Sequence, residues 1–150
     1  MSSAPLPADE LPRLAALRRL AILDTPPEER FDRVTRLAQQ RFGVPVALIT
    51  LIDSDRQWFK SRQGTDICET PRDVSFCAHA ILHDDILVVP DACRDSRFSS
   101  NPLVTGEPFI RFYAGRPLAD AEGHRLGTLC IVDTRCRSFD DADRQALRYV

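Results

Sequence analysis

Two side chains that could act as a nucleophile and its base, Cys77 and His79, stand two residues apart. Such a pair must lie within hydrogen-bond reach of each other. Segment 75–82, after Asp73, has the composition of a short helix, on which side chains two residues apart point about 160° away from each other. We therefore interpret Cys77 as a small buried residue and His79 as a hydrogen-bonded one. Only an extended backbone would place both on one face.

The remaining thiols form no recognisable metal or disulfide pattern. The five cysteines are an odd number without a C-x-x-C pair, and the three histidines have no spacing typical of a zinc site. No apolar run is long enough to span a bilayer, and no signal peptide opens the sequence. We expect a cytoplasmic protein with reduced thiols and no structural metal.

A cation and a phenol are expected on one face of a strand. In the predicted strand 111–118, Arg111 and Tyr113 alternate with Phe112, which must face the other way. Either polar side chain could orient an anionic or aromatic ligand. Arg111 could equally tie down the acidic loop around Asp91 and Asp95, and we favour this structural role.

Loop 90–104 precedes that strand and carries Phe98 among polar residues. Binding residues often lie on loops that a rigid sheet supports, so this loop marks the mouth of a candidate pocket. Its Asp95 and Asn101 are of types that more commonly serve as turn and capping residues.

Helical patterns lie on both sides of these candidates. Residues 1–9 are expected to form a flexible leader. An amphipathic helix follows, in which Arg13 is expected to point away from an apolar stripe of Leu11, Leu14, Leu17, Leu20, Ala21 and Leu23. A second helix is predicted over 26–42, with Thr25 as its cap and Glu28 completing a capping box. A last helix begins near Asp140 and reaches the end of the sequence without a cap, so we expect it to continue further.

Apolar runs and alternation predict strands over 46–53, 57–63, 86–89, 111–118 and 126–133. The first is apolar on both faces, which is typical of a central strand covered on both sides. Segment 65–72 is polar and irregular. The order of elements predicts an α+β fold, in which helices cover an antiparallel sheet.

Eight motifs resemble the GAF domains that are fused to bacterial histidine kinases and diguanylate cyclases. They are LDTPPEERFD (23–32), DSDRQWFKS (53–61), FCAHAI (76–81), VVPDA (88–92), DSRF (95–98), NPLV (101–104), IRFYAG (110–115) and LGTLCIVD (126–133). The resemblance extends over residues 10–150. It implies a sheet of five or six antiparallel strands with terminal helices on one face, and short helices and loops over a ligand pocket on the other.

This resemblance also assigns a candidate pocket to segments that converge on one sheet face. Its predicted lining residues are Phe76, Cys77, His79, Phe98, Arg111, Tyr113 and Thr128. The pattern associated with cyclic-nucleotide GAF domains is not visible, and the Cys-His pair that tethers a bilin in photoreceptors is replaced by Cys77-Ala78-His79. Both ligand classes are therefore disfavoured, and the cofactor stays unassigned.

The implied function is a non-catalytic regulatory domain. It would bind an unidentified small molecule, pair with a second copy through its terminal helices, and control a covalently attached output domain of histidine kinase or diguanylate cyclase type. Two alternatives stay open: a thiol-dependent free methionine sulfoxide reductase that uses Cys68, Cys77 and Cys93, and a ligand-free dimerisation module. A net charge of -2 with arginines dispersed among acids argues against nucleic acid as a partner, and a membrane partner is not expected.

Overall fold

Strands that are apolar on both faces form the centre of the sheet. In the computed structural model, which describes residues 3–150, β1 (Val46–Ile52) pairs antiparallel with β2 (Arg56–Gln63) and with β6 (Arg125–Asp133). The outer strands are β3 (Glu69–Pro71), β4 (Leu87–Val89) and β5 (Phe112–Ala119), and the sheet order is β3-β2-β1-β6-β5-β4. This confirms the predicted α+β, GAF-like antiparallel sheet.

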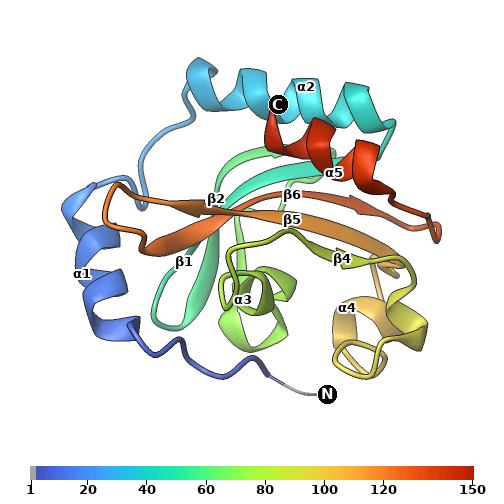
Figure 1. Ribbon diagram of the computed structural model, residues 1–150, viewed down its shortest axis with the longest axis horizontal. Helices are drawn as coiled ribbons and strands as arrows, with labels where there is room; N and C mark the ends of the chain where they lie inside the picture. Colours follow the sequence, from blue (N-terminus) through green and yellow to red (C-terminus); the bar gives the residue numbers. More distant parts are fainter. Residues whose placement is uncertain (1–2) are drawn as a thin grey trace.

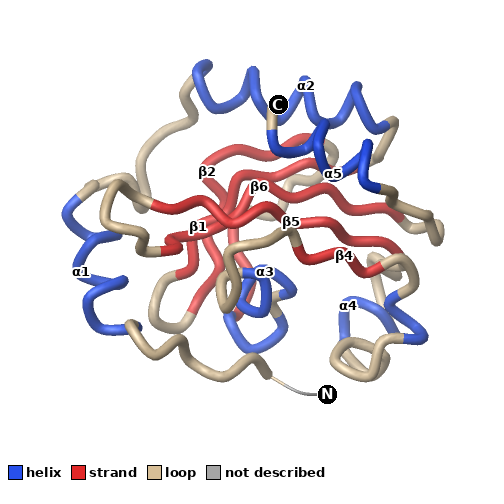
Figure 2. Tube along the Cα trace, viewed as in Figure 1, coloured by secondary structure: helices blue, strands red, loops and turns tan. Residues whose placement is uncertain are grey.

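Helices cover both faces of this sheet (Figure 1; Figure 2). α2 (Glu29–Phe42) and α5 (Asp141–Arg148) lie side by side on one face. The short helices α3 (Phe76–Ala80) and α4 (Pro102–Thr105), with the 3-10 turns η1 (Arg72–Val74) and η2 (Ala92–Arg94), accompany the loops on the other face. α1 (Glu10–Arg19) lies at one end of the sheet.

Alternation along the strands separates two apolar cores. Ala47 and Ile49 of β1 join the core beneath α2 and α5, whereas Leu48 and Ile52 join the core on the α3 side. The same alternation sends Phe112 and Tyr113 of β5 to opposite cores, as the sequence predicts. A third cluster fixes α1: its Ala16 and Leu17 pack against Leu51, Trp58 and Leu126.

The first helix differs from its prediction. It ends at Arg19 because Ala21 adopts a left-handed φ of 50°, which an α-helix cannot accommodate. Arg13, expected to point away from the apolar stripe, is fully buried and pairs with Glu10. Of the expected leader, residues 1–2 lie outside the described part of the chain, and residues 3–7 precede the turn into α1 without regular structure, with Pro7 buried.

The start of the second helix also differs. α2 begins at Glu29 rather than at 26, its N-cap is Glu28, and no side chain caps it. The Thr25 hydroxyl instead donates to the Ile22 carbonyl and accepts a hydrogen bond from Lys60, so the predicted capping box does not form. The C-terminal end agrees with expectation, because Gly43 adopts the left-handed conformation, with φ of 61°.

One smaller difference concerns a segment of weak periodicity. Segment 65–72 contributes β3, a short edge strand paired with β2. Ser75 caps α3 through its hydroxyl. At α5, Asp140 and Asp143 form a reciprocal capping box.

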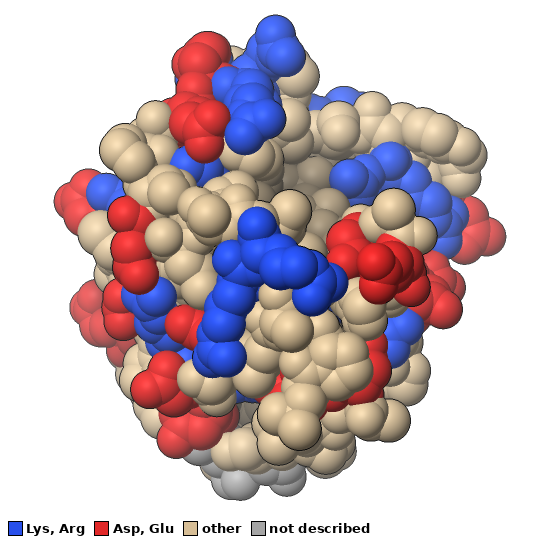
Figure 3. Space-filling model, turned by 90° about the vertical axis from the view of Figure 1, so that its left-hand side faces the viewer, with Lys and Arg blue, Asp and Glu red and all other residues tan. Residues whose placement is uncertain are grey.

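Surface charge of both signs is dispersed over the side of the molecule on which α1 lies (Figure 3). Within the described residues, no helix is both long and apolar enough to cross a membrane.

Candidate functional site

An apolar cavity of about 160 Å³ opens between the sheet and the segments on its α3 side. Its walls come from three sources: β1, β2, β5 and β6 of the sheet, helices α3 and α4, and the connections 64–70 and 108–110. Its apolar lining comprises Val46, Leu48, Phe59, Ile67, Phe76, Leu103, Pro108, Ile110 and Val132, and its polar lining comprises Gln57, Thr65, Thr70, Cys77, Tyr113 and Cys130. None of these described lining residues carries a formal charge at neutral pH when its thiol or phenol is protonated.

The sulfur of Cys77 is the centre of a buried hydrogen-bond cluster at this cavity. It accepts hydrogen bonds from Tyr113 Oη and Thr128 Oγ1, each at 3.0 Å, and lies 3.8 Å from Cys130 Sγ. Thr128 Oγ1 in turn lies 3.0 Å from Thr50 Oγ1. Three strands and α3 therefore meet at one thiol.

This arrangement separates the acidities of the two thiols. Burial raises the pKa of Cys77, but its hydrogen bonds, first with Cys130 and then with Thr128 and Tyr113, outweigh burial and lower the pKa to about 7. The hydrogen bond with Cys77, followed by burial, raises the pKa of Cys130 well above its usual range. Cys77 is thus the more acidic thiol of the pair.

Tyr113 stays a donor in this cluster. Burial, followed by the neighbouring charge on Cys77, raises the pKa of its phenol well above the ordinary value. Its ring passes over Gly115, two residues along β5, where a Cβ atom would lie only 2.1 Å from Tyr113 Oη. The absence of a side chain at Gly115 therefore leaves the space that lets the phenol reach Cys77.

Of the seven predicted pocket residues, the structure brings Phe76, Cys77 and Tyr113 into the cavity wall. Thr128 is fully buried one layer deeper, where it contacts Cys77. Phe98 stacks on Phe76 with ring centroids 4.0 Å apart and thus supports the wall from behind.

His79 and Arg111 lie outside the cavity lining. The imidazole of His79 packs edge-to-face with Phe98, with ring centroids 4.8 Å apart. Arg111 donates to the carbonyls of Val104 and Ile110, at 2.9 and 3.0 Å. It therefore holds the end of the loop through the Val104 carbonyl, whereas Asp91 and Asp95, its expected partners, pair with Arg94 and Arg97.

Sequence reasoning missed Cys130 and the 64–70 connection. Cys130 follows Thr128 by two residues on a predicted strand, so alternation alone places both on one face. The 64–70 connection offered no such signal, because its short strand is polar. Cys68 and Cys93, grouped with Cys77 in the reductase alternative, are exposed and do not line the cavity.

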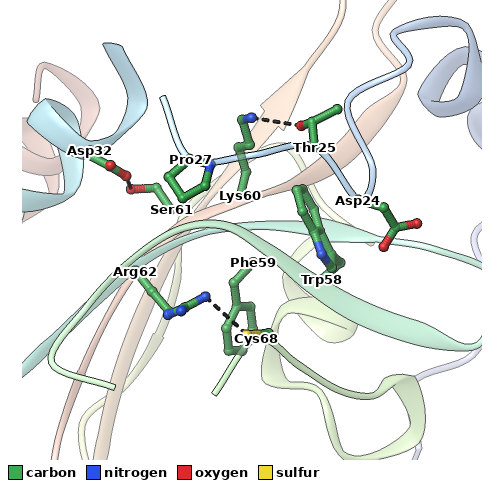
Figure 4. Close-up of a pocket in the computed structure, with 10 residues that line it drawn as sticks. All are labelled: Asp24, Thr25, Pro27, Asp32, Trp58, Phe59, Lys60, Ser61, Arg62 and Cys68. Atoms are coloured by element: carbon green, nitrogen blue, oxygen red, sulfur yellow. Dashed lines mark hydrogen bonds between the residues drawn. The ribbon is translucent and has the colours of Figure 1, made fainter. Parts of the chain in front are cut away.

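A second hollow, an open groove of about 410 Å³, lies between β2 and the linker that joins α1 to α2 (Figure 4). The fully buried Lys60 ammonium donates to Thr25 Oγ1 and to the Pro26 carbonyl, and pairs with Glu28 at 2.7 Å. Ser61 donates to Asp32 at 2.6 Å. Because these polar groups satisfy one another, the groove is best explained as the seam that attaches the linker to the sheet.

Comparisons with known proteins agree with this architecture. A profile of the GAF domain matches residues 26–150. A cyclic di-GMP phosphodiesterase of Pseudomonas aeruginosa is 47% identical over 137 residues, which make up 91% of this chain and 23% of that protein. The chain thus spans under a quarter of that relative's length.

Two solved structures share the fold. The GAF domain of a phosphoenolpyruvate-protein phosphotransferase from Acinetobacter superposes with a TM-score of 0.63 at 17% identity, covering 91% of this chain and 85% of that one. A free methionine-R-sulfoxide reductase from Neisseria meningitidis, solved with its substrate, gives 0.64 at 17% identity, covering 98% and 89%. At these identities the likeness concerns the fold alone. Since the family profile covers most of the sequence, the chain belongs to the GAF domain family.

Proposed function

We propose that this GAF domain is a sensory module that binds a small, uncharged, largely apolar molecule in the cavity on the α3 side. The cavity carries the proposal: its walls are mainly apolar, and among its polar groups Cys77 contacts Tyr113 and Cys130. Ligand sites commonly combine an apolar wall with a small number of placed polar groups. A volume of about 160 Å³ corresponds to a ligand no larger than a single aromatic ring, since engineered apolar cavities of about 150 Å³ bind benzene.

Binding would be transmitted through β6 to the last helix. Val132 and Cys130 line the cavity, and the next residue after Val132, Asp133, accepts a hydrogen bond from Arg137 at 2.8 Å. Arg137 also donates to the carbonyls of Phe42 and Gly43 at the end of α2. A shift of β6 would therefore change the packing of α2 and α5, which lie on the opposite sheet face.

The output of this module is proposed to be a covalently attached signalling domain. A histidine kinase or diguanylate cyclase is the expectation from the sequence motifs, and the relative from Pseudomonas aeruginosa adds a cyclic di-GMP phosphodiesterase to these. All five cysteines are free, which favours a reducing compartment such as the cytoplasm. We further propose that two copies associate through the terminal helices, as signalling domains with paired outputs require.

Thermal unfolding with benzene and with phenol tests the cavity. Either probe should raise the melting temperature of the wild type, because a ligand that binds only the folded state stabilises it. Leu103→Trp, which fills the cavity from α4, should abolish the shift. Leu37→Trp adds the same ring on the exposed face of α2 and should retain it. No shift in the wild type, or equal shifts in both variants, would contradict binding in this cavity.

Hydrogen exchange tests whether binding in the cavity is transmitted through β6 to α5. With benzene bound, amides of α5 should change their exchange rate together with those of β6. Native mass spectrometry of gently purified protein then reports any retained natural ligand. A change confined to the cavity walls would contradict signalling through β6.

A further inference from the structure

We propose that Cys77 and Cys130 form a peroxide-sensitive dithiol, which a small uncharged hydroperoxide that enters through the cavity oxidises to a disulfide. Both sulfurs line the cavity and lie 3.8 Å apart. A disulfide requires a sulfur–sulfur distance of about 2.05 Å, so the pair must close by less than 2 Å, a movement within reach of side-chain rotation on α3 and β6. The site uses the same cavity as the proposed ligand but does not depend on that ligand.

The hydrogen bonds divide the roles between the two thiols. Cys77 accepts from Tyr113 and Thr128, and these donors stabilise a thiolate. Cys130 Sγ lies 3.8 Å from Cys77 Sγ, and its raised pKa keeps it protonated until Cys77 is oxidised. Cys77 is therefore the attacking sulfur and Cys130 the resolving one.

The reaction balances as a two-electron oxidation. The Cys77 thiolate attacks one oxygen of hydrogen peroxide, a sulfur–oxygen bond forms, the oxygen–oxygen bond breaks, and the departing hydroxide takes the proton that Cys77 released. Cys130 then attacks the sulfenic sulfur, so that the disulfide bond forms and the sulfur–oxygen bond breaks. The second hydroxide leaves as water with the proton of Cys130. Two thiols are oxidised, and one peroxide is reduced to two waters.

The cavity wall selects the class of oxidant. Because no described lining residue other than the Cys77 thiolate carries charge, a large ionic disulfide such as oxidised glutathione finds neither space nor a counter-charge. Hydrogen peroxide is small and neutral.

The experiment uses the full chain with the exposed Cys68, Cys93 and Cys136 replaced by serine. After treatment with hydrogen peroxide at pH 7 and denaturation, N-ethylmaleimide should find no free thiol, whereas the untreated protein reacts at both. Peptide mass spectrometry should find 77 and 130 linked within one chain. Oxidised glutathione should react at least about tenfold more slowly. Two thiols that stay free after peroxide, or a disulfide that forms only in urea, would overturn the proposal.

Two variants test the assigned roles. Cys130→Ala should retain reactivity at Cys77 but stop at the sulfenic acid, which dimedone traps; an unreactive Cys77 here would overturn the mechanism. Tyr113→Phe should react about fivefold more slowly at pH 7, because loss of one donor to a charged sulfur raises the pKa of Cys77 by about one unit. At pH 9 this difference should disappear, which a purely structural defect would not produce. Thiol counts are independent of benzene binding, so failure here and failure of the ligand proposal are separable.

Discussion

At the residue scale, the Cys77 thiol is the described group of the cavity wall that is best placed to react. It is buried, yet the hydroxyls of Tyr113 and Thr128 donate to it, and a glycine two residues from Tyr113 leaves room for the phenol. Buried polar groups are costly unless they are satisfied, so this cluster must either stabilise the fold as a complete network or serve a reaction. The two roles predict different responses to pH.

The pKa of Cys77 predicts how stability depends on pH. Its folded pKa of about 7 lies below the ordinary value of 9.0, so ionisation favours the folded state. The contribution is fully present above pH 9 and is lost as pH falls through 7, with a magnitude on the order of 2 kcal/mol. Cys130, whose pKa is raised, opposes it above pH 9.

Urea unfolding between pH 6 and 9 measures this contribution. The free energy of unfolding of the variant without Cys68, Cys93 and Cys136 should rise over this range relative to the same protein carrying Cys77→Ala. Thiolate absorbance in the ultraviolet should titrate with a midpoint near 7. A midpoint at or above 9 would show that the hydrogen bonds do not overcome burial.

At the element scale, α1 is attached by charge as well as by apolar contact. Glu10 accepts from Arg13 at 2.9 Å and from Arg72 of η1 at 2.6 Å. Burial raises the pKa of Glu10, but the hydrogen bonds from Arg72 and Arg13 outweigh it and lower the pKa. One guanidinium nitrogen of Arg13, Nη1, is the only buried side-chain nitrogen or oxygen among the described residues without a hydrogen-bond partner.

This asymmetry predicts unequal effects of two substitutions. Glu10→Gln removes the shared negative charge and one of its two acceptor oxygens, and leaves two guanidinium groups without a counter-charge, so unfolding should become easier by about 3 kcal/mol. Arg13→Met removes a group that is already incompletely paired, and should change stability by less than about 1 kcal/mol. Chemical denaturation at pH 7 compares them. Equal losses would mean that Arg13 contributes as much as Glu10. The Glu10 effect should fade as pH falls below 4.5, where the unfolded carboxyl protonates.

These elements also show what the sequence could predict. Strand faces followed from alternation, so Tyr113 was placed in the pocket and Phe112 in the opposite core. The burial of Arg13 could not be predicted, because its partner network includes Arg72, a residue 59 positions away whose proximity exists only after folding. Thr25 likewise had a local signal for capping, but Lys60 of β2 competes for its hydroxyl. Where a buried charge must find a partner, long-range pairing outweighs the conformation that the local sequence pattern favours.

At the scale of the whole molecule, the two terminal helices occupy different places. α5 lies beside α2 on one sheet face, whereas α1 lies at the end of the sheet (Figure 1). Of the apolar stripe predicted for the first helix, Leu14 and Leu17 are buried, whereas Leu11, Leu20 and Ala21 are exposed. A charge at Leu17 would disturb the packing of α1 within one chain and so would not test association.

Association of two copies is better tested at apolar residues that are exposed. Leu11 on α1 is 80% exposed, and Tyr149, which follows α5, is 79% exposed. Leu20 is also exposed, but at 100° per residue it points to the opposite side of the helix from Leu11. If two copies pair through α1, Leu11→Glu should weaken the dimer by at least about tenfold, or about 1.4 kcal/mol. Tyr149→Glu should do the same if α5 contributes. Leu37→Glu, on the exposed face of α2, is the matched control and should leave association unchanged.

Sedimentation velocity over a range of concentrations gives the dissociation constants. A wild type that stays monomeric at the highest concentration, or a Leu11→Glu variant that dimerises as tightly as Leu37→Glu, would place the paired surface elsewhere than on α1.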